Sequence, residues 1–130
     1  MLFYYKLDAI TGRSYTYEEA KNISQRFGSS LRKMGIKKED VVAIFMSNSP
    51  DYITCLTGII GVGAVATPIN PNYTEFELKR QLDMSKASCI IADSSTLKVV
   101  KKAIENDKGK YALLSSHSIL FKYNFMCSLA

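Results

Sequence analysis

The fold is decided by residues 40–70, DVVAIFMSNSPDYITCLTGIIGVGAVATPIN. The stretch opens on an uninterrupted apolar run, which predicts a strand buried on both faces, because a strand with one wet face would alternate apolar with polar residues. Ser49 followed by Pro50 predicts the start of a helix, since serine can cap and proline loses no useful hydrogen bond at the first helical position. The predicted elements are the strand Val41–Met46, a helix from Pro50 to about Gly61–Gly63, and a second strand Ala64–Ile69.

An amphipathic helix precedes this stretch. Thr16 and Glu19 form a capping box, in which the hydroxyl and the carboxylate each satisfy a backbone N–H, and Gly35 can adopt the left-handed conformation that ends a helix. Further upstream, two short segments flank the Thr11-Gly12 turn and predict a small hairpin. These elements are the hairpin strands Phe3–Asp8 and Arg13–Tyr15, and a helix over Thr16–Gly35 whose apolar face holds Tyr17, Ala20, Ile23, Phe27, Leu31 and Met34.

Three further elements follow the deciding stretch. Thr74 and Glu77 form a second capping box, which predicts a helix in which Leu78 and Leu82 stack one turn apart. A short apolar run then predicts a third buried strand, and the hydroxyl-rich segment that starts at Asp93 supplies caps for another helix. These elements are a helix from Thr74 to about Lys86, the strand Cys89–Ala92, and a helix lined by Leu97, Val100 and Ile104 that ends near Asn106.

Strands and helices alternate along the chain at the spacing of right-handed crossovers. The alternation predicts an α/β fold, a parallel sheet with covering helices, preceded by the N-terminal hairpin. Residues 111–130 carry one formal charge, Lys122, among apolar residues and serines. We therefore expect a partial domain over residues 1–110 and a divergent apolar tail over 111–130, with one more strand near 111–114. A membrane span is disfavoured, because the uninterrupted apolar segments of the tail are far shorter than the ~20 residues that a span requires.

The composition limits the classes of function. The 130 residues include 17 Lys and Arg against 12 Asp and Glu, a formal net charge of +5, so nucleic-acid binding is permitted but not indicated. The three cysteines have no CxxC spacing and there is one histidine, so neither a zinc site nor a disulfide framework is expected. Inert, buried cysteines fit a reduced intracellular compartment, either cytoplasm or peroxisome. The cysteines are Cys55, Cys89 and Cys127.

Residues with catalytic chemistry are scarce. His117 stands among serines without a partnered acid and nucleophile. Gly58, Gly61 and Gly63 follow the order GxxGxG at the end of a helix, whereas a dinucleotide-binding motif opens one, so we expect close packing of the helix end against the sheet and a tight turn. Asp93 lacks the acidic pair and the lysine of a phosphoacceptor site and is explained better as a helix cap. We assign no catalytic, cofactor-binding or metal-binding residue.

A succession of short motifs runs through residues 11–106: Thr11-Gly12, Thr16–Glu19, Met34-Gly35, Asp40–Ile44, Asn48–Tyr52, Gly63–Val65 and Pro68–Pro71. Each motif alone is weak, but their order and spacing together are specific. In this succession the chain resembles the N-terminal part of the adenylate-forming, AMP-dependent synthetases. It is most similar to the branch that holds 4-coumarate:CoA ligases, acyl-CoA synthetases of fatty acid metabolism, and firefly luciferase.

The resemblance implies a ligase that uses ATP and Mg²⁺ to adenylate a carboxylic acid, releases pyrophosphate, and passes the acyl group to the thiol of CoA. The family's TSGTTGxPKG-like phosphate loop, its YGxTE-like adenine and Mg²⁺ segment, its ribose-binding aspartate and its C-terminal lysine are not found in this sequence. Those parts supply nearly all of the phosphate clamping and charge stabilisation. We therefore expect a fragment of an acid:CoA ligase that binds no cofactor and is inactive by itself, and the sequence does not indicate which acid its parent uses.

Two alternatives stay open. A non-catalytic α/β interaction module would bind a protein partner, such as the full-length enzyme, through an exposed apolar strand edge. A small basic nucleic-acid binder is supported by the net charge of +5 and the eight tyrosines alone, without a groove-reading helix or an RNA-binding motif. The abrupt change after Lys110 also fits a truncated gene product or an incomplete gene model.

Overall fold

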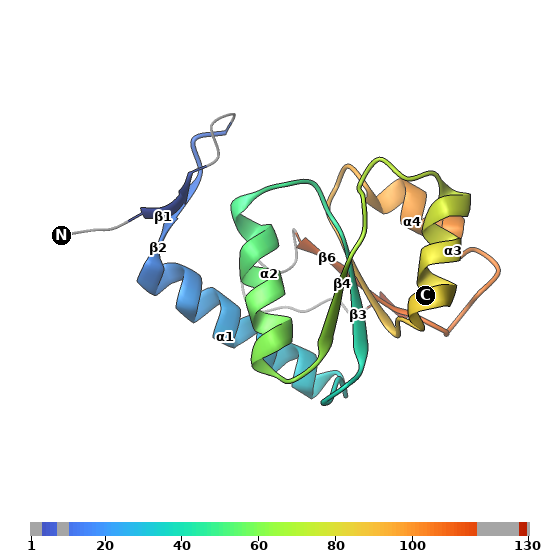
Figure 1. Ribbon diagram of the computed structural model, residues 1–130, viewed down its shortest axis with the longest axis horizontal. Coiled ribbons are helices and arrows are strands. Elements are labelled where there is room, and N and C mark those ends of the chain that lie inside the picture. Colours follow the sequence, from blue (N-terminus) through green and yellow to red (C-terminus); the bar gives the residue numbers. More distant parts are fainter. Residues whose placement is uncertain (1–3, 8–10, 117–127, 130) are drawn as a thin grey trace.

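The computed structural model describes residues 4–7, 11–116 and 128–129. Figure 1 shows a sheet in the middle of the molecule, helices on both sides of it, and a hairpin at the N-terminal end. The fold is therefore mixed α/β, as the sequence predicts. In chain order its elements are β1 Tyr4–Leu7, β2 Ser14–Thr16, α1 Tyr17–Lys33, β3 Val41–Phe45, α2 Pro50–Gly61, β4 Val65–Pro68, α3 Glu75–Ser85, β5 Cys89–Ala92, α4 Leu97–Ala103, β6 Ala112–Ser115 and β7 Ser128–Leu129.

The main sheet has five strands in the order β4-β3-β5-β6-β7. Strands β4, β3, β5 and β6 run parallel, and β7 pairs antiparallel with β6. Parallel neighbours need a crossover connection, and α2, α3 and α4 lie in the three crossovers. Strands β1 and β2 form a separate antiparallel pair, with an irregularity between Tyr4 and Lys6. The parallel sheet and the N-terminal hairpin are thus both confirmed.

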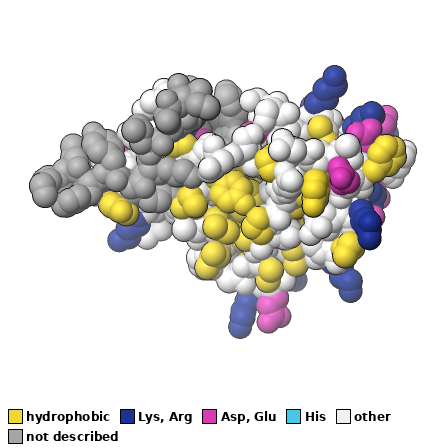
Figure 2. All heavy atoms as spheres, turned by 45° about the horizontal axis from the view of Figure 1, so that its top comes forward, with side chains coloured by type: hydrophobic (Ala, Val, Ile, Leu, Met, Phe, Trp, Pro, Cys, Tyr) yellow, Lys and Arg dark blue, Asp and Glu magenta, His cyan; other side chains and the backbone are white. Residues whose placement is uncertain are grey.

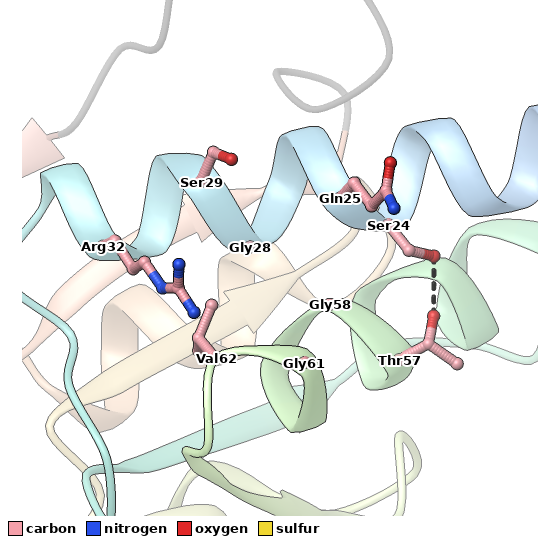
Figure 3. A pocket seen from close by; sticks show the side chains of 9 residues that line it. All are labelled: Ser24, Gln25, Gly28, Ser29, Arg32, Thr57, Gly58, Gly61 and Val62. Atoms are coloured by element: carbon pink, nitrogen blue, oxygen red, sulfur yellow. Dashed lines mark hydrogen bonds between the residues drawn. The ribbon is translucent and has the colours of Figure 1, made fainter.

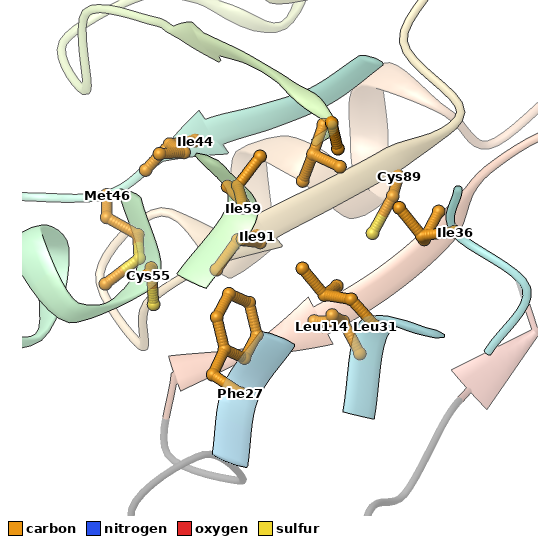
Figure 4. Close-up of a cluster of buried hydrophobic side chains, with 12 residues drawn as sticks. Phe27, Leu31, Ile36, Ile44, Met46, Cys55, Ile59, Cys89, Ile91 and Leu114 are labelled. Atoms are coloured by element: carbon orange, nitrogen blue, oxygen red, sulfur yellow. The ribbon is translucent and has the colours of Figure 1, made fainter. Parts of the chain in front are cut away.

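The central strands β3 and β5 are buried on both faces. Alternate residues of a strand point to opposite sides of the sheet, so each strand contributes side chains to two cores, one on each face. Ile44 of β3 and Ile91 of β5 face α1 and α2, and Figure 4 shows them with Phe27 and Leu31 of α1. The next residue along each strand, Phe45 and Ala92, belongs to a second core cluster that is covered by α3 and α4. On that second face the covering side chains are Leu78 and Leu82 of α3 and Val100 of α4.

Both predicted capping boxes are confirmed. The hydroxyl of Thr16 accepts the N–H of Glu19, and the Glu19 carboxylate accepts the N–H of Thr16 at 2.8 Å. Thr74 and Glu77 repeat this arrangement at the start of α3. Each box satisfies backbone donors that the first turn of a helix leaves without partners, so these two helices begin where the sequence predicts.

Two predicted details of the helix termini were wrong: the side-chain cap at the start of α2, and the residue at which α4 ends. The side chain of Ser49 makes no capping hydrogen bond at the start of α2, where its backbone carbonyl accepts an N–H of the first turn at 3.1 Å instead. Helix α4 ends at Ala103 and not near Asn106, because the carbonyl of Ile104 accepts the N–H of Asp107 in a following turn. Neither difference changes the order of the elements.

Strand β6 extends the sheet beyond β5. Tyr111, just before it, is 2% exposed, and the N–H of Ala112 donates to the carbonyl of Ser88 at 2.9 Å. The strand predicted near residues 111–114 is therefore present. No helix within the described residues is long and apolar enough to cross a membrane. The rest of the predicted tail, residues 117–127 and 130, lies outside the described residues, and His117 and Cys127 lie there too.

Candidate functional site at the carboxyl edge of the sheet

The carboxyl ends of β3 and β5 lie side by side at the centre of the sheet. The loop after β3 leads into α2 on one face, and the loop after β5 leads into α4 on the other face. Open parallel sheets bind ligands where neighbouring loops leave the sheet in opposite directions. The loops 46–49 and 93–96 are therefore the candidate site to which the topology points.

The Asp93 carboxylate ties these two loops together. One of its oxygens accepts the N–H of Ser47 at 2.7 Å. The other accepts the N–H groups of Ser95 and Thr96 at 2.9 and 3.0 Å and the Ser95 hydroxyl at 2.6 Å. The Thr96 hydroxyl also donates to the carbonyl of Phe45 at 2.6 Å. Backbone and hydroxyl donors of the protein thus hold both oxygens of Asp93.

These hydrogen bonds fix the charge state of Asp93. Partial burial of the carboxyl acts to raise its pKa, but the hydrogen bonds from Ser95, Ser47 and Thr96 outweigh burial and hold the pKa below its ordinary value. The carboxylate accepts the backbone N–H groups of Ser95 and Thr96 in the turn before α4. The N-cap residue of α4 is Thr96 and the helix has no side-chain capping hydrogen bond, so the predicted capping role of Asp93 is corrected to that of closing this turn. The network thus joins the loops after β3 and β5 at the point where they leave the sheet in opposite directions.

A second candidate is a hollow of about 410 Å³ beside the crossing of α1 and α2, which Figure 3 shows. The helices approach closely because Gly28 and Gly58 have no side chains, and a Cβ on Gly28 would lie 3.1 Å from the Gly58 carbonyl oxygen. The hydroxyls of Ser24 and Thr57 form a hydrogen bond across the crossing at 2.6 Å. Each also lies within hydrogen-bond distance of a carbonyl of its own helix, to which the hydroxyl that accepts in this bond donates. The hydroxyls of Ser24 and Thr57 therefore hold the two helices together.

The predicted roles of the glycine cluster are corrected in part. Gly58 packs against α1, and not against the sheet, because a Cβ there would meet Phe27 and Ser24 of that helix. Gly63 has φ +79 and makes the expected tight turn into β4. A Cβ on Gly61 would meet nothing within 4 Å.

A buried carboxylate anchors the N-terminal hairpin. Asp51, in the first turn of α2 and 5% exposed, accepts hydrogen bonds from Arg13 at 2.6 and 2.7 Å and from the Tyr15 hydroxyl at 2.6 Å. Burial and the hydrogen bond to Asp51 raise the pKa of Tyr15 to about 12. Sequence reasoning missed this cluster, since no local pattern links residues so far apart along the chain.

We expect this anchor to loosen at high pH. Because the pKa of Tyr15 rises on folding from about 10 to about 12, its stabilising effect is complete below pH 10 and is lost as the pH rises towards 12. The test is urea unfolding of the wild type and Tyr15→Phe at pH 8 and pH 11.5. The difference in the free energy of unfolding between the two proteins should shrink at the higher pH, and an unchanged difference would contradict this role of Tyr15.

Comparison with known proteins decides the family. A family model described as "AMP-binding enzyme" matches residues 4–124. This chain belongs to the AMP-binding enzyme family. Among the curated relatives, 4-coumarate–CoA ligase 3 of Arabidopsis thaliana is 43% identical over 96 residues, 74% of this chain and 17% of the relative. The enzyme of the same name from Oryza sativa subsp. japonica is 35% identical over 96 residues, with the same two coverages.

Solved structures of this family share the fold. A fatty acyl CoA synthetase of Mycobacterium tuberculosis is 26% identical with a TM-score of 0.77, over 85% of this chain and 22% of that one. A benzoate CoA ligase from Burkholderia xenovorans LB400 has a TM-score of 0.76 at 22% identity, over 90% of this chain and 25% of that one, a likeness of fold. The chain spans 17 to 19% of the length of the curated 4-coumarate–CoA ligases that it matches.

The carboxyl edge does not fit the phosphates of ATP. The loops 46–49 and 93–96 contain one charged side chain, the Asp93 carboxylate, and protein donors already hold both of its oxygens. A triphosphate is bound by cations and by N–H groups that point at it. At this edge the charged group is instead an anion, and that anion already accepts the nearby N–H groups. In the part of the chain that the structure describes, no group of three or more His, Cys, Asp or Glu side chains could hold a metal ion.

Cys55 and Cys89 are fully buried in the core between the sheet and the helices α1 and α2. Burial raises the pKa of the Cys55 thiol, so it stays protonated and unreactive. The expectation that the cysteines are buried packing residues is confirmed for these two.

Proposed function

We propose that this chain forms one layer of the N-terminal part of an ATP-dependent acid:CoA ligase. Such an enzyme joins a carboxylic acid to AMP, releases pyrophosphate, and transfers the acyl group to the thiol of CoA. The observation that carries the proposal is the 43% identity to a 4-coumarate–CoA ligase over 96 residues, 74% of this chain. Family membership over residues 4–124 supports it.

In this proposal the segment supplies a scaffold and other parts of the enzyme supply the chemistry. The central strands and both core clusters form a rigid support, and rigid elements are what hold an active site in its productive geometry. ATP, Mg²⁺, CoA and the small-molecule acid belong to the whole enzyme. We place that enzyme in the cytoplasm or the peroxisome.

The proposal predicts that the purified 130-residue chain catalyses no ATP-dependent exchange of pyrophosphate. The measurement is incorporation of labelled pyrophosphate into ATP in the presence of Mg²⁺ and a panel of acids, including 4-coumarate, benzoate, anthranilate and a fatty acid. An intact 4-coumarate–CoA ligase serves as the positive control. Exchange by the isolated chain above the rate without acid would overturn the scaffold proposal, because the loops 46–49 and 93–96 contain no cationic side chain to bind the phosphates.

A further inference from the structure

Apolar and charged side chains are segregated on the surface of this chain. Figure 2 shows hydrophobic side chains gathered in the middle of one face, with Lys and Arg side chains towards its rim. A place where the two kinds meet suits a molecule that is apolar at one end and charged at the other. The line along which α1 meets α2 is such a place, because its lining changes from apolar to cationic.

Two neighbouring hollows form one groove along this line. The first is the hollow of about 410 Å³ in Figure 3, and the second, of about 390 Å³, continues it towards the start of α1. Ser24, Gln25 and Thr57 line both hollows. The lining residues of α1 recur at intervals of three and four from Tyr17 to Arg32, as one side of a helix does. We call the two hollows together the α1–α2 groove.

The end of the α1–α2 groove at the start of α1 is apolar. Tyr17, which is 61% exposed, lines it with Ala20 and Ile53. The surface that this end exposes to solvent is almost entirely apolar. A peptide that lay here would leave backbone N–H and C=O groups without partners, whereas an alkyl chain has no polar groups to satisfy. This end therefore favours an alkyl chain.

The other end of the α1–α2 groove holds a cation. The Arg32 side chain extends from α1 towards Val62 at the end of α2, as Figure 3 shows. Its guanidinium forms no ion pair or hydrogen bond with the residues that the structure describes. Beside it the groove is open, since a Cβ on Gly61 would meet nothing within 4 Å. The guanidinium is thus available to a ligand.

The polar groups of the α1–α2 groove favour an anion. Lys21 and Arg32 are the charged residues of its lining, and both are cations. Gln25 and Ser29 add an amide and a hydroxyl at the Arg32 end. A guanidinium can donate two parallel hydrogen bonds to a phosphate, and a phosphate monoester offers three acceptor oxygens with a charge of about −1.5 to −2 at pH 7. The Arg32 end therefore suits a phosphate.

We propose that the α1–α2 groove binds a single-chain lipid with a phosphate head group. The phosphate accepts hydrogen bonds from Arg32, and the acyl chain lies along the groove towards Tyr17 and Ile53. The length fits, because Tyr17 and Arg32 are about 22 Å apart along α1 and one acyl chain spans half of the ~30 Å hydrocarbon core of a bilayer. The Arg32 end lies where α2 leads into β4, at the edge of the sheet opposite to the loops 46–49 and 93–96. The inference does not depend on the proposed function.

The test measures binding of 1-lauroyl lysophosphatidate, kept below its micelle concentration, to the 130-residue chain by isothermal titration calorimetry. Wild-type chain should bind one molecule, and Arg32→Gln should weaken binding at least about tenfold, because charge-assisted hydrogen bonds are lost. Lys33→Gln is the matched control, since Lys33 is a cation in the same last turn of α1 but does not line the groove. It should leave the dissociation constant within about twofold of wild type, as an exposed charge contributes little.

The two halves of the ligand are tested separately. Glycerol 3-phosphate supplies the head group alone and 1-lauroyl glycerol supplies the chain alone, and each should bind at least about tenfold more weakly than the whole lipid. Ile53→Ser should weaken binding of the lipid, whereas Ile60→Ser should not, because Ile60 is on α2 but outside the groove. Circular dichroism checks that each variant is folded.

Three results would overturn this inference. The first is no binding of lysophosphatidate to wild-type chain. The second is equal weakening by Arg32→Gln and Lys33→Gln, because the cations would then act as a diffuse surface charge. The third is binding to vesicles of phosphatidylcholine and phosphatidic acid without binding of monomeric lysophosphatidate, because the chain would then dock on a membrane surface and not enclose a single lipid.

Discussion

Replacing Gly58 by alanine is expected to lower the free energy of unfolding by about 3 kcal/mol, the upper range for overpacking a tight contact. The new Cβ would lie 2.7 Å from Cδ1 of Phe27 and 2.9 Å from the backbone oxygen of Ser24. Phe27 is 2% exposed and sits in the core between the sheet and the helices, so neither neighbour can move aside cheaply. Helices α1 and α2 would have to separate, which disturbs every side chain between them.

Gly61 provides the matched control for this change. It is the last residue of α2, and a Cβ there would meet nothing within 4 Å. Gly61→Ala should leave stability unchanged or raise it by up to about 1 kcal/mol, the helix propensity difference between glycine and alanine. Urea unfolding followed by circular dichroism measures both variants. Equal stability of Gly58→Ala and Gly61→Ala would contradict the close crossing of α1 and α2.

Replacing Asp93 by alanine is expected to lower the free energy of unfolding by about 2 kcal/mol, since several charge-assisted hydrogen bonds are lost together. The variant would leave the N–H groups of Ser47, Ser95 and Thr96 without their acceptor. The loops after β3 and β5 would then separate from each other where they leave the sheet. Chemical denaturation at pH 7 measures the loss, and a loss below about 0.5 kcal/mol would mean that water replaces the carboxylate.

The same carboxylate predicts a pH dependence. Its pKa in the folded chain lies below the ordinary aspartate value, so its stabilising effect is present above about pH 4, the pKa of an unfolded aspartate, and is lost as the pH falls further. Asp93→Asn keeps one acceptor oxygen but does not titrate. The difference in stability between wild type and Asp93→Asn should therefore narrow between pH 6 and pH 3. A constant difference in stability would show that the stabilising effect of Asp93 comes from the shape of its side chain and not from its charge.

Local chemistry made most of the fold predictable. The capping boxes Thr16–Glu19 and Thr74–Glu77 act within one turn of helix, so their residues alone determine where α1 and α3 begin. The run Cys89–Ala92 predicts a strand buried on both faces, and all four of its residues are buried. Alternating strands and helices then leave a parallel sheet as the arrangement that short right-handed crossovers allow.

Contacts between distant parts of the chain were not predictable. Nothing near Arg13 indicates that its partner is Asp51, and nothing near Gly58 indicates that its neighbour is Phe27 and not the sheet. Asp93 was predicted to cap a helix from its place in the sequence, but it closes the turn before α4 instead. Its bond to Ser47 depends on β5 lying next to β3. Such details require the order of strands, which one sequence does not contain.

The most direct test of the scaffold role is a chimaera. Residues of this chain replace the 96 aligned residues of Arabidopsis 4-coumarate–CoA ligase 3, and formation of 4-coumaroyl-CoA is measured with 4-coumarate and with benzoate as competing acids. The account predicts an active enzyme whose preference between the two acids stays within about threefold of the parent, a change worth less than 1 kcal/mol. A folded chimaera that forms no CoA ester, or that reverses the preference between the acids, would contradict it.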